Sequence, residues 1–347
     1  MKKMLAVLLA VLMSAAVLPL AAAEGTVVVY NWEDYIDPDV QDLFEQETGI
    51  QVKYVNFTQN EDMLVEVRTS PNTFDVVFPS DYAIERLIKE DLLAELDYSK
   101  LPNAENLLDW VRDLPYDPQG AHSVPYMWGT LGILYNTTMI TEEVDSWAIL
   151  FDKKYQKDVL MWDSIRDSMG IALIYLGYSA NSRDAKEIQE ATQLLIQQKV
   201  DGIVKAYQGD EMKDKMVAGE AAMAVQYSGD AQYAIDLNEN LAYAVPKEGS
   251  NIFVDAMVIP KGAPNMDNAH AFINFMLRPD IAQRNCEYIR YSSTNKAAIE
   301  LMGEEYTSNP NLNPPQEVID QCEFYEDIEE PFLTLYNNRW SEVKNAK

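Results

Sequence analysis

Residues 26–35 read TVVVYNWEDY and couple a buried strand to a group of functional side chains. The run Val27–Tyr30 is apolar and rich in β-branched residues, which predicts a strand buried in a sheet. Trp32, Asp34 and Tyr35 follow at its carboxyl end. Because ligands of open α/β sheets bind at the carboxyl ends of strands, we expect an α/β fold with a ligand near these residues. Two aromatic faces beside a carboxylate suit a ligand that is both apolar and cationic.

The first 23 residues have the pattern of a secretory signal peptide. Lys2 and Lys3 form a short positive segment, Met4–Leu20 is almost wholly apolar or small, and Ala21–Ala23 provides an A-x-A cleavage site. We expect cleavage before Glu24 and an exported mature chain in the periplasm or another extracytoplasmic space. An uncleaved membrane anchor is the alternative. No later segment is apolar for long enough to span a bilayer.

The size and charge of the chain limit its class. Its 347 residues are enough to bury two sizeable cores, which favours two lobes over one. There are 56 acidic and 27 basic residues, and the formal net charge is −29. Such a charge repels nucleic acid and anionic lipid and attracts cations. Acidity also promotes solubility, so the charge permits a cationic ligand without identifying one.

Strand and helix signals alternate from Thr26 onward, which is typical of an α/β sheet. Asp37 as N-cap, Pro38 at the first helical position and Gly49 as a stop predict a helix over 38–48. Further strands are expected near 50–54, 74–78, 124–128, 131–135, 159–162, 222–227, 242–245 and 253–259, and further helices near 81–89, 185–198 and 331–344.

The two expected lobes are interleaved in sequence, because no break divides the chain into halves. The extended pieces near 124–135 and 242–259 are suited to carry the chain between them. We expect one lobe from 24–131 plus about 254–300, and the other from about 132–253 plus 301–347.

Two cysteines, Cys286 and Cys322, are the only ones in the chain. In an oxidising compartment they are candidates for one disulfide, which would close a loop of about 35 residues and contribute roughly 3–4 kcal/mol. Two reduced thiols are the alternative.

Motifs of catalysis are missing from the sequence. The two histidines, His122 and His270, lack metal-ligand spacing, and there is no C-x-x-C, no G-x-S-x-G and no P-loop. A carboxylate pair for glycoside hydrolysis is always available among 56 acidic residues and therefore says little. We expect a protein that is not an enzyme and needs no cofactor or metal.

Aromatic and acidic residues recur together around the ends of the expected strands. Beyond the first group, the members of this pattern are Asp81 and Tyr82, Ser164 and Asp167, Tyr227 and Asp230, and Phe253 and Asp255. Each alone has an ordinary interpretation as a core aromatic or a helix cap, but the repetition indicates one site. A linear diamine or polyamine would suit it, because each ammonium needs carboxylate acceptors and the methylene stem needs flat apolar walls.

The sequence also resembles the spermidine/putrescine-binding periplasmic proteins of ABC importers over nearly all of the mature chain. The matching segments are YNWEDYI, FEQETGI, FDVVFPSDY, SVPYMWGT, GEAAMAVQYSGD, VPKEGSNIFVDAMVIP, INFMLRPDIA and STNKAA. The resemblance implies a two-lobe periplasmic-binding-protein fold of type II, with a hinge and an interlobe ligand cleft. It also implies a polyamine ligand, the transmembrane subunits of an ABC permease as partners, a monomer, and no nucleic acid.

The resemblance assigns roles to individual residues. Trp32 and Tyr35 match the first aromatic pair, and Ser80 and Tyr82 match the second contact loop. Asp167 takes the place of an amine-binding acid that is usually Glu, and Tyr227 takes the place of a Trp in the pocket. Phe253 matches an aromatic residue of the pocket, Asp255 the central amine-binding Asp, and Tyr291 the closing Tyr.

Departures from the pattern favour putrescine over spermidine. Spermidine-preferring members of the resembling family carry an Asp at the position of Ser164, so one carboxylate is missing here. Asp34, Asp230 and Phe253 instead match putrescine-preferring members. The alternatives are another cationic solute such as a basic amino acid, thiamine or a chelated metal, a sensory subunit without transport, and an enzyme such as a glycosidase.

Overall fold

The computed structural model describes residues 25–347, and the expected signal peptide lies outside them. The strands are β1 Gly25–Trp32, β2 Ile50–Phe57, β3 Val76–Val77, β4 Ser123–Asn136, β5 Val159–Trp162, β6 Val204–Gln208, β7 Met223–Tyr227, β8 Leu241–Ala244, β9 Ile252–Val258 and β10 Ser292–Ser293. The α-helices are α1 Pro38–Thr48, α2 Asn60–Thr69, α3 Asp81–Lys89, α4 Ile165–Tyr175, α5 Ala185–Val200, α6 Met212–Val217, α7 Ser228–Leu237, α8 Met266–Met276, α9 Pro279–Ile289, α10 Lys296–Thr307, α11 Gln316–Ile319 and α12 Phe332–Asn345. Short 3₁₀ helices cover Tyr98–Lys100, Pro102–Asn106, Asp109–Arg112, Trp147–Phe151 and Lys153–Tyr155.

The strands form one curled sheet in the order β2-β1-β3-β9-β4-β7-β5-β6, with β8 and β10 also paired to β4. β1 runs parallel to β2 and β3, and β5 runs parallel to β6 and β7. The long strands β4 and β9 pair antiparallel in the middle. The sheet is therefore mixed, with a parallel group at each end and an antiparallel junction between them.

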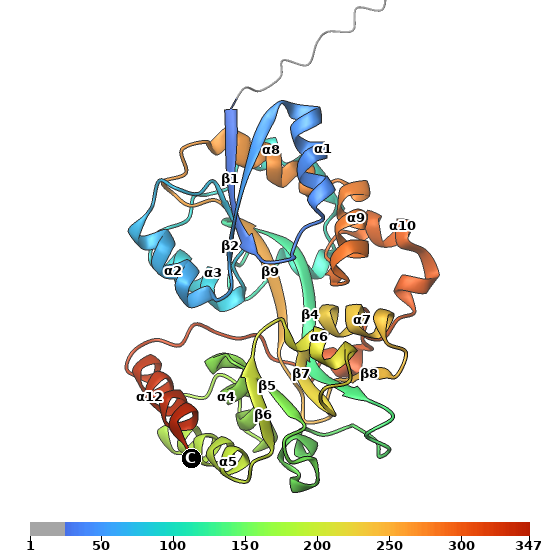
Figure 1. The fold of residues 1–347 in the computed structure, drawn as a ribbon. Helices are drawn as coiled ribbons and strands as arrows, with labels where there is room; N and C mark the ends of the chain where they lie inside the picture. The colour runs from blue at the N-terminus through green and yellow to red at the C-terminus, as the bar shows by residue number, and fades with distance from the viewer. Residues whose placement is uncertain (1–24) are drawn as a thin grey trace, which may run out of the picture.

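Two lobes lie on either side of that junction (Figure 1). Each has its own apolar core. We call lobe 1 the half that packs around β1–β3 with α1–α3 and α8–α10, and lobe 2 the half that packs around β5–β8 with α4–α7 and α12. β4 contributes Val124 and Trp128 to the core of lobe 1 and Leu131 and Ile133 to the core of lobe 2. The α/β two-lobe prediction is thus confirmed, while the sequence limits of each lobe stay a prediction.

Local signals explain several elements well. Asp37 accepts a hydrogen bond from the backbone N–H of Asp39 at the start of α1, and Gly49 ends this helix with φ 76°. The two extended pieces expected around 124–135 form a single strand, β4. Gly129 lies in its middle, where an added Cβ would come within 2.6 Å of Ser228 Oγ and 3.1 Å of the Phe253 ring. The absence of a side chain at this position lets β4 pass closely against α7 and β9.

The expected disulfide is not formed, and both thiols are free. Cys286 is buried on α9, where its Sγ lies 3.5 Å from Met127 Sδ. Cys322 follows α11 and lies 3.2 Å from the carbonyl oxygen of Val318. The two side chains therefore have separate partners. In residues 25–347 no helix combines the length and apolar character needed to cross a bilayer, and no three His, Cys, Asp or Glu side chains group to hold a metal ion.

Candidate ligand-binding site

Asp255 is the central acidic residue of the site. It lies on β9, at the junction of the lobes, and is only 6% exposed. Its Oδ2 accepts a hydrogen bond of 2.9 Å from Tyr35 Oη, while its Oδ1 has no partner among the described residues. Burial raises the pKa of Asp255 to about 7, although the hydroxyls of Ser80 and Tyr35 act in the opposite direction. A buried acceptor left free in this way is costly unless a cation or donor reaches it.

Two more buried carboxyl groups, Asp81 and Asp167, belong to this acidic group, since Asp81 lies within electrostatic range of both Asp255 and Asp167. Asp81 begins α3 in lobe 1, and Asp167 lies in the first turn of α4 in lobe 2. Burial raises the pKa of Asp81 well above its ordinary value, and the negative charges of Asp255 and Asp167 add to this effect. Asp81 Oδ2 has no hydrogen-bond partner in the part of the chain that the structure describes. Burial also raises the pKa of Asp167, which accepts a hydrogen bond of 2.8 Å from Tyr227 Oη.

Four aromatic rings run past these carboxyl groups from one lobe to the other. We call Tyr227, Phe253, Tyr291 and Tyr35 the aromatic row. Consecutive ring centroids along it are 5.2, 5.8 and 5.4 Å apart, each pair close to edge-to-face. The row gives an apolar wall between Asp167 at its lobe 2 end and Asp255 beside Tyr35, which is the combination expected for a diamine.

A second acidic group closes the other side of the site. Asp230 on α7 is 9% exposed and accepts a hydrogen bond of 2.9 Å from Tyr291 Oη. Lys213 of α6 donates to Asp230 Oδ1 at 3.2 Å, and its Nζ lies 3.9 Å from Asp34 Oδ2 of lobe 1. Asp34 itself has a left-handed backbone, with φ 51°, and a side chain that is 78% exposed. The predicted pair Asp34 and Asp230 is therefore brought together, but around a lysine of the protein.

Other predicted residues lie at the margin of this group. Trp32 packs against Phe57 with ring centroids 4.4 Å apart. The hydroxyl of Tyr82 donates to Glu61 at 3.1 Å and accepts from the amide of Asn60 at 3.2 Å. Ser164 acts as the N-cap of α4, where its hydroxyl accepts from the backbone N–H of Asp167.

Three residues of the site had no distinguishing signal in the sequence. The ring of Trp162, at the end of β5, lies 5.1 Å from that of Tyr227 and extends the aromatic wall into lobe 2. Arg166 is buried, with its guanidinium 4.7 Å from the ring centroid of Tyr325. Its positive charge lowers the pKa of Asp167 against the larger effect of burial. Lys213 is the third residue without a signal, because no sequence pattern distinguishes it from the other lysines of the chain.

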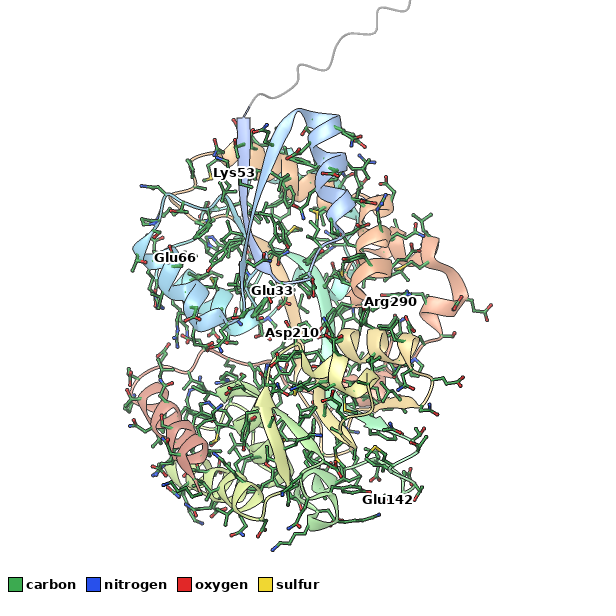
Figure 2. All side chains as sticks on the ribbon, in the orientation of Figure 1. Glu33, Lys53, Glu66, Glu142, Asp210 and Arg290 are labelled. Carbon is green, nitrogen blue, oxygen red and sulfur yellow. The ribbon has the colours of Figure 1, made fainter. Side chains whose placement is uncertain are left out.

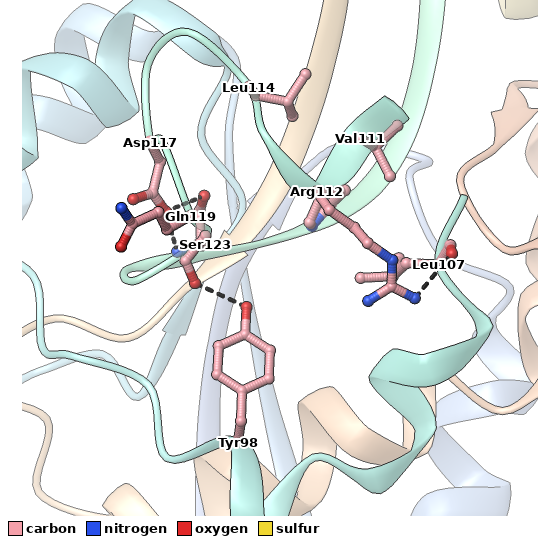
Figure 3. A pocket seen from close by; sticks show the side chains of 10 residues that line it. Tyr98, Leu107, Val111, Arg112, Leu114, Asp117, Gln119 and Ser123 are labelled. Carbon is pink, nitrogen blue, oxygen red and sulfur yellow. Dashed lines mark hydrogen bonds between the residues drawn. The ribbon is translucent and has the colours of Figure 1, made fainter. Parts of the chain in front are cut away.

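A separate cavity of about 250 Å³ lies in lobe 1 beside Tyr98, Arg112 and Asp117 (Figure 3). None of the predicted site residues lines it. Asp117 accepts hydrogen bonds from three backbone N–H groups and from Ser123 Oγ, and Arg112 donates to three backbone carbonyl oxygens. These polar groups are matched within the protein and hold the surrounding loops, so the cavity lacks the unmatched carboxylates of the interlobe site.

Two α/β lobes that enclose carboxylates and aromatic rings at their junction define the class of two-lobed solute-binding proteins. The chain belongs to the family of bacterial extracellular solute-binding proteins, whose model matches residues 40–314.

Relatives of the chain agree with this family assignment. The chain is 33% identical to a spermidine/putrescine-binding periplasmic protein of Salmonella typhimurium, over 94% of each chain. It is 33% identical to a putrescine-binding periplasmic protein of Pseudomonas aeruginosa, over the whole of both chains. A solved structure described as a spermidine/putrescine ABC transporter protein of Listeria monocytogenes has 42% identity and a TM-score of 0.89, and covers 93% of this chain and 99% of its own. The resemblance found in the sequence is confirmed, and these relatives are binding proteins of transporters rather than enzymes.

Proposed function

We propose that this protein is an extracytoplasmic solute-binding protein that captures a polyamine between its lobes and delivers it to an ABC importer. Putrescine is the favoured ligand and spermidine the second candidate. The names of the relatives support this class of ligand. The observation that carries the proposal is Asp255, a buried carboxyl group with one oxygen that has no partner among the described residues.

An alkyl ammonium group would satisfy this oxygen better than any uncharged donor. It brings a full positive charge and up to three N–H donors, which offsets the desolvation of the carboxylate. Oδ2 of Asp81 lies in the same acidic group and is a second buried acceptor without a partner among the described residues. A methylene stem would lie along the aromatic row, where the rings exclude water. An ammonium group over a ring face would gain cation–π attraction of about 0.5–2 kcal/mol.

Closure follows from where these contacts originate. Tyr35 and Asp81 come from lobe 1, Tyr227 and Asp167 from lobe 2, and Asp255 from the strand that joins them. A ligand that contacts all of them binds the closed arrangement more tightly than an open one and so shifts the population toward closure. The closed, monomeric protein then docks on the transmembrane subunits of a permease.

Isothermal titration calorimetry tests the proposal. Protein unfolded, freed of any ligand and refolded is titrated with putrescine, cadaverine, spermidine and spermine. We expect one-to-one binding that is tightest for a diamine. If none of these cations binds or competes, the protein has a different solute and the proposed function is wrong.

A further inference from the structure

The acidic groups of the site form three positions along the aromatic row where a cation could bind, and we call these positions stations. Asp167 is bonded to Tyr227 at one end, Asp255 is bonded to Tyr35, and Asp230 is bonded to Tyr291. Three carboxylates along one apolar wall would match three amines of a linear ligand. The third station differs from the other two because it already has a cation.

Lys213 places its ammonium group at this third station. Nζ lies 3.2 Å from Asp230 Oδ1 and 3.9 Å from Asp34 Oδ2, and the lysine side chain is only 15% exposed. Its neighbours Met212 and Met216 are fully buried in a small apolar cluster with Ala231 and Ala234 of α7. Because this cluster fixes α6 against α7, the position of Lys213 beside Asp230 is set by the packing of lobe 2.

Both oxygens of Asp230 are engaged, since Tyr291 donates to Oδ2 and Lys213 to Oδ1. Asp255 and Asp81 each keep one oxygen without a partner within residues 25–347. Burial alone would lower the pKa of Lys213, but the carboxyl groups of Asp230 and Asp210 raise it above its ordinary value. Asp210 lies at the level where the lobes meet, as does Glu33 (Figure 2). Lys213 therefore stays charged, and a second ammonium beside it would meet both repulsion and an occupied acceptor.

We propose that Lys213 is a tethered ammonium that occupies the third cation station and restricts the site to diamines. The inference rests on the proposed function and deepens it by naming the residue that selects the number of charged amines in the ligand. A diamine fills the stations of Asp167 and Asp255 and leaves Lys213 in place. A triamine or tetramine would have to bring a further charge to Asp230 and displace the lysine. Lys213 also links lobe 2 to Asp34 of lobe 1, so it closes this side of the site.

The test compares the affinities of Lys213→Gln and the unchanged protein for putrescine and spermidine by calorimetry. Gln keeps much of the side-chain length but removes the charge, which leaves Asp230 and Asp34 open to a ligand amine. We expect the ratio of spermidine affinity to putrescine affinity to rise at least tenfold, equivalent to about 1.4 kcal/mol. Lys213→Arg keeps the cation and should leave the ratio within about threefold of the original.

Lys215→Gln is the matched control, because Lys215 lies on the same helix and contacts Gln208 rather than an acidic group of the site. Its ratio should not change. Thermal unfolding of each variant reports whether it is folded. If Lys213→Gln does not fold, the affinity ratio of Lys213→Arg is measured in its place. The role of Lys213 is overturned if Lys213→Gln binds diamines with an unchanged ratio of spermidine to putrescine affinity, or if this ratio rises equally in Lys213→Arg. Either result leaves the proposed function standing. Failure of every form to bind any polyamine overturns the proposed function as well.

Discussion

At the scale of single residues, the candidate site contains two buried carboxyl groups, Asp255 and Asp81, each with one oxygen that has no partner among the described residues. Exposed ion pairs such as Lys261 with Asp91 contribute little to stability. Asp255 is different, since it is buried and one of its oxygens lacks a donor in the described chain. The free energy lost by burying this charge becomes available as affinity when a cation arrives.

Replacing Asp255 with Asn should weaken diamine binding by at least about 2 kcal/mol, roughly 30-fold, because the variant lacks the charge that holds the ammonium. Calorimetry measures the loss. Asp109→Asn serves as the control, since the Asp109 side chain is fully exposed and its ion-pair partner is Arg112, which is outside the proposed site. The ligand-free Asp255→Asn protein should be no less stable at pH 8 than the original, because no desolvated charge remains. Unchanged affinity would contradict the role of Asp255.

The raised pKa of Asp255, about 7, makes binding depend on pH. Between its ordinary value of 3.8 and about 7 the folded carboxyl group binds more protons than the unfolded one, so ligand-free stability falls as pH rises through this window. An ammonium needs the ionised form, so diamine affinity should fall as pH drops below 7, by up to about tenfold per pH unit.

Titrations at pH 6 in two buffers of different ionisation enthalpy should detect proton release as the diamine binds. Asp81 also contributes, because burial raises its pKa too. The Asp255→Asn variant should lose much of this dependence. Affinity that is constant from pH 5 to 8 without proton release would show that the carboxyl groups are already ionised in the ligand-free protein.

At the scale of secondary-structure elements, α7 packs closely against Tyr291, the residue before β10. Gly229 lies in the first turn of α7, and a Cβ added there would come within 2.3 Å of the Tyr291 ring. The closeness of this contact requires glycine, since even the smallest side chain would push Tyr291 away. The hydrogen bond from Tyr291 to Asp230 depends on the same approach.

Gly229→Ala should therefore weaken ligand binding about tenfold or more, while the fold keeps its stability because Ala favours helix over Gly by up to about 1 kcal/mol. Leu237→Ala is the control on the same helix, at a position that is 58% exposed. Calorimetry and thermal unfolding together separate the two effects. If Gly229→Ala binds as tightly as the original protein, the contact of Tyr291 with α7 is not needed for closure.

Elements with strong local signals were predictable from the sequence, and those defined by packing were not. The N-cap, proline and glycine of α1 predicted its limits, and the helices α3, α5 and α12 and the strand β7 lie close to where they were expected. The sequence divided β4 into two pieces because Gly129 interrupts its apolar run. Helices α8 and α9 were not predicted individually, although Pro279 at the first position of α9 is a start signal.

At the scale of the whole molecule, two strands, β4 and β9, connect the lobes. β4 and β9 pair over most of their length and extend from one core to the other (Figure 1). Asp255 and Phe253 lie on β9 itself, so a ligand bound at the proposed site would contact the connection between the lobes as well as both of their faces. Ligand binding and lobe closure are therefore linked.

A diamine at 100 times its dissociation constant should stabilise the protein against unfolding by about 2.7 kcal/mol, as mass action requires. It should also reduce the radius of gyration of refolded, ligand-free protein, because contacts from both lobes favour the closed form. Thermal unfolding and small-angle X-ray scattering measure the two effects. Stabilisation without any change in scattering would mean that the lobes are already closed before the ligand arrives.

The sequence by itself determined the α/β class, the interleaving of the chain and the residue types of the site. It did so because strand periodicity, helix caps and the aromatic and acidic residues near strand ends are local features. Only the tertiary structure decided which of these side chains meet. Tyr35 and Asp255 are 220 positions apart, and Lys213 reaches Asp34 across the lobe interface. Within residues 25–347, oxygens of Asp255 and Asp81 are buried without a partner, and Lys213 is held beside Asp230. Both features depend on long-range packing that no local pattern encodes.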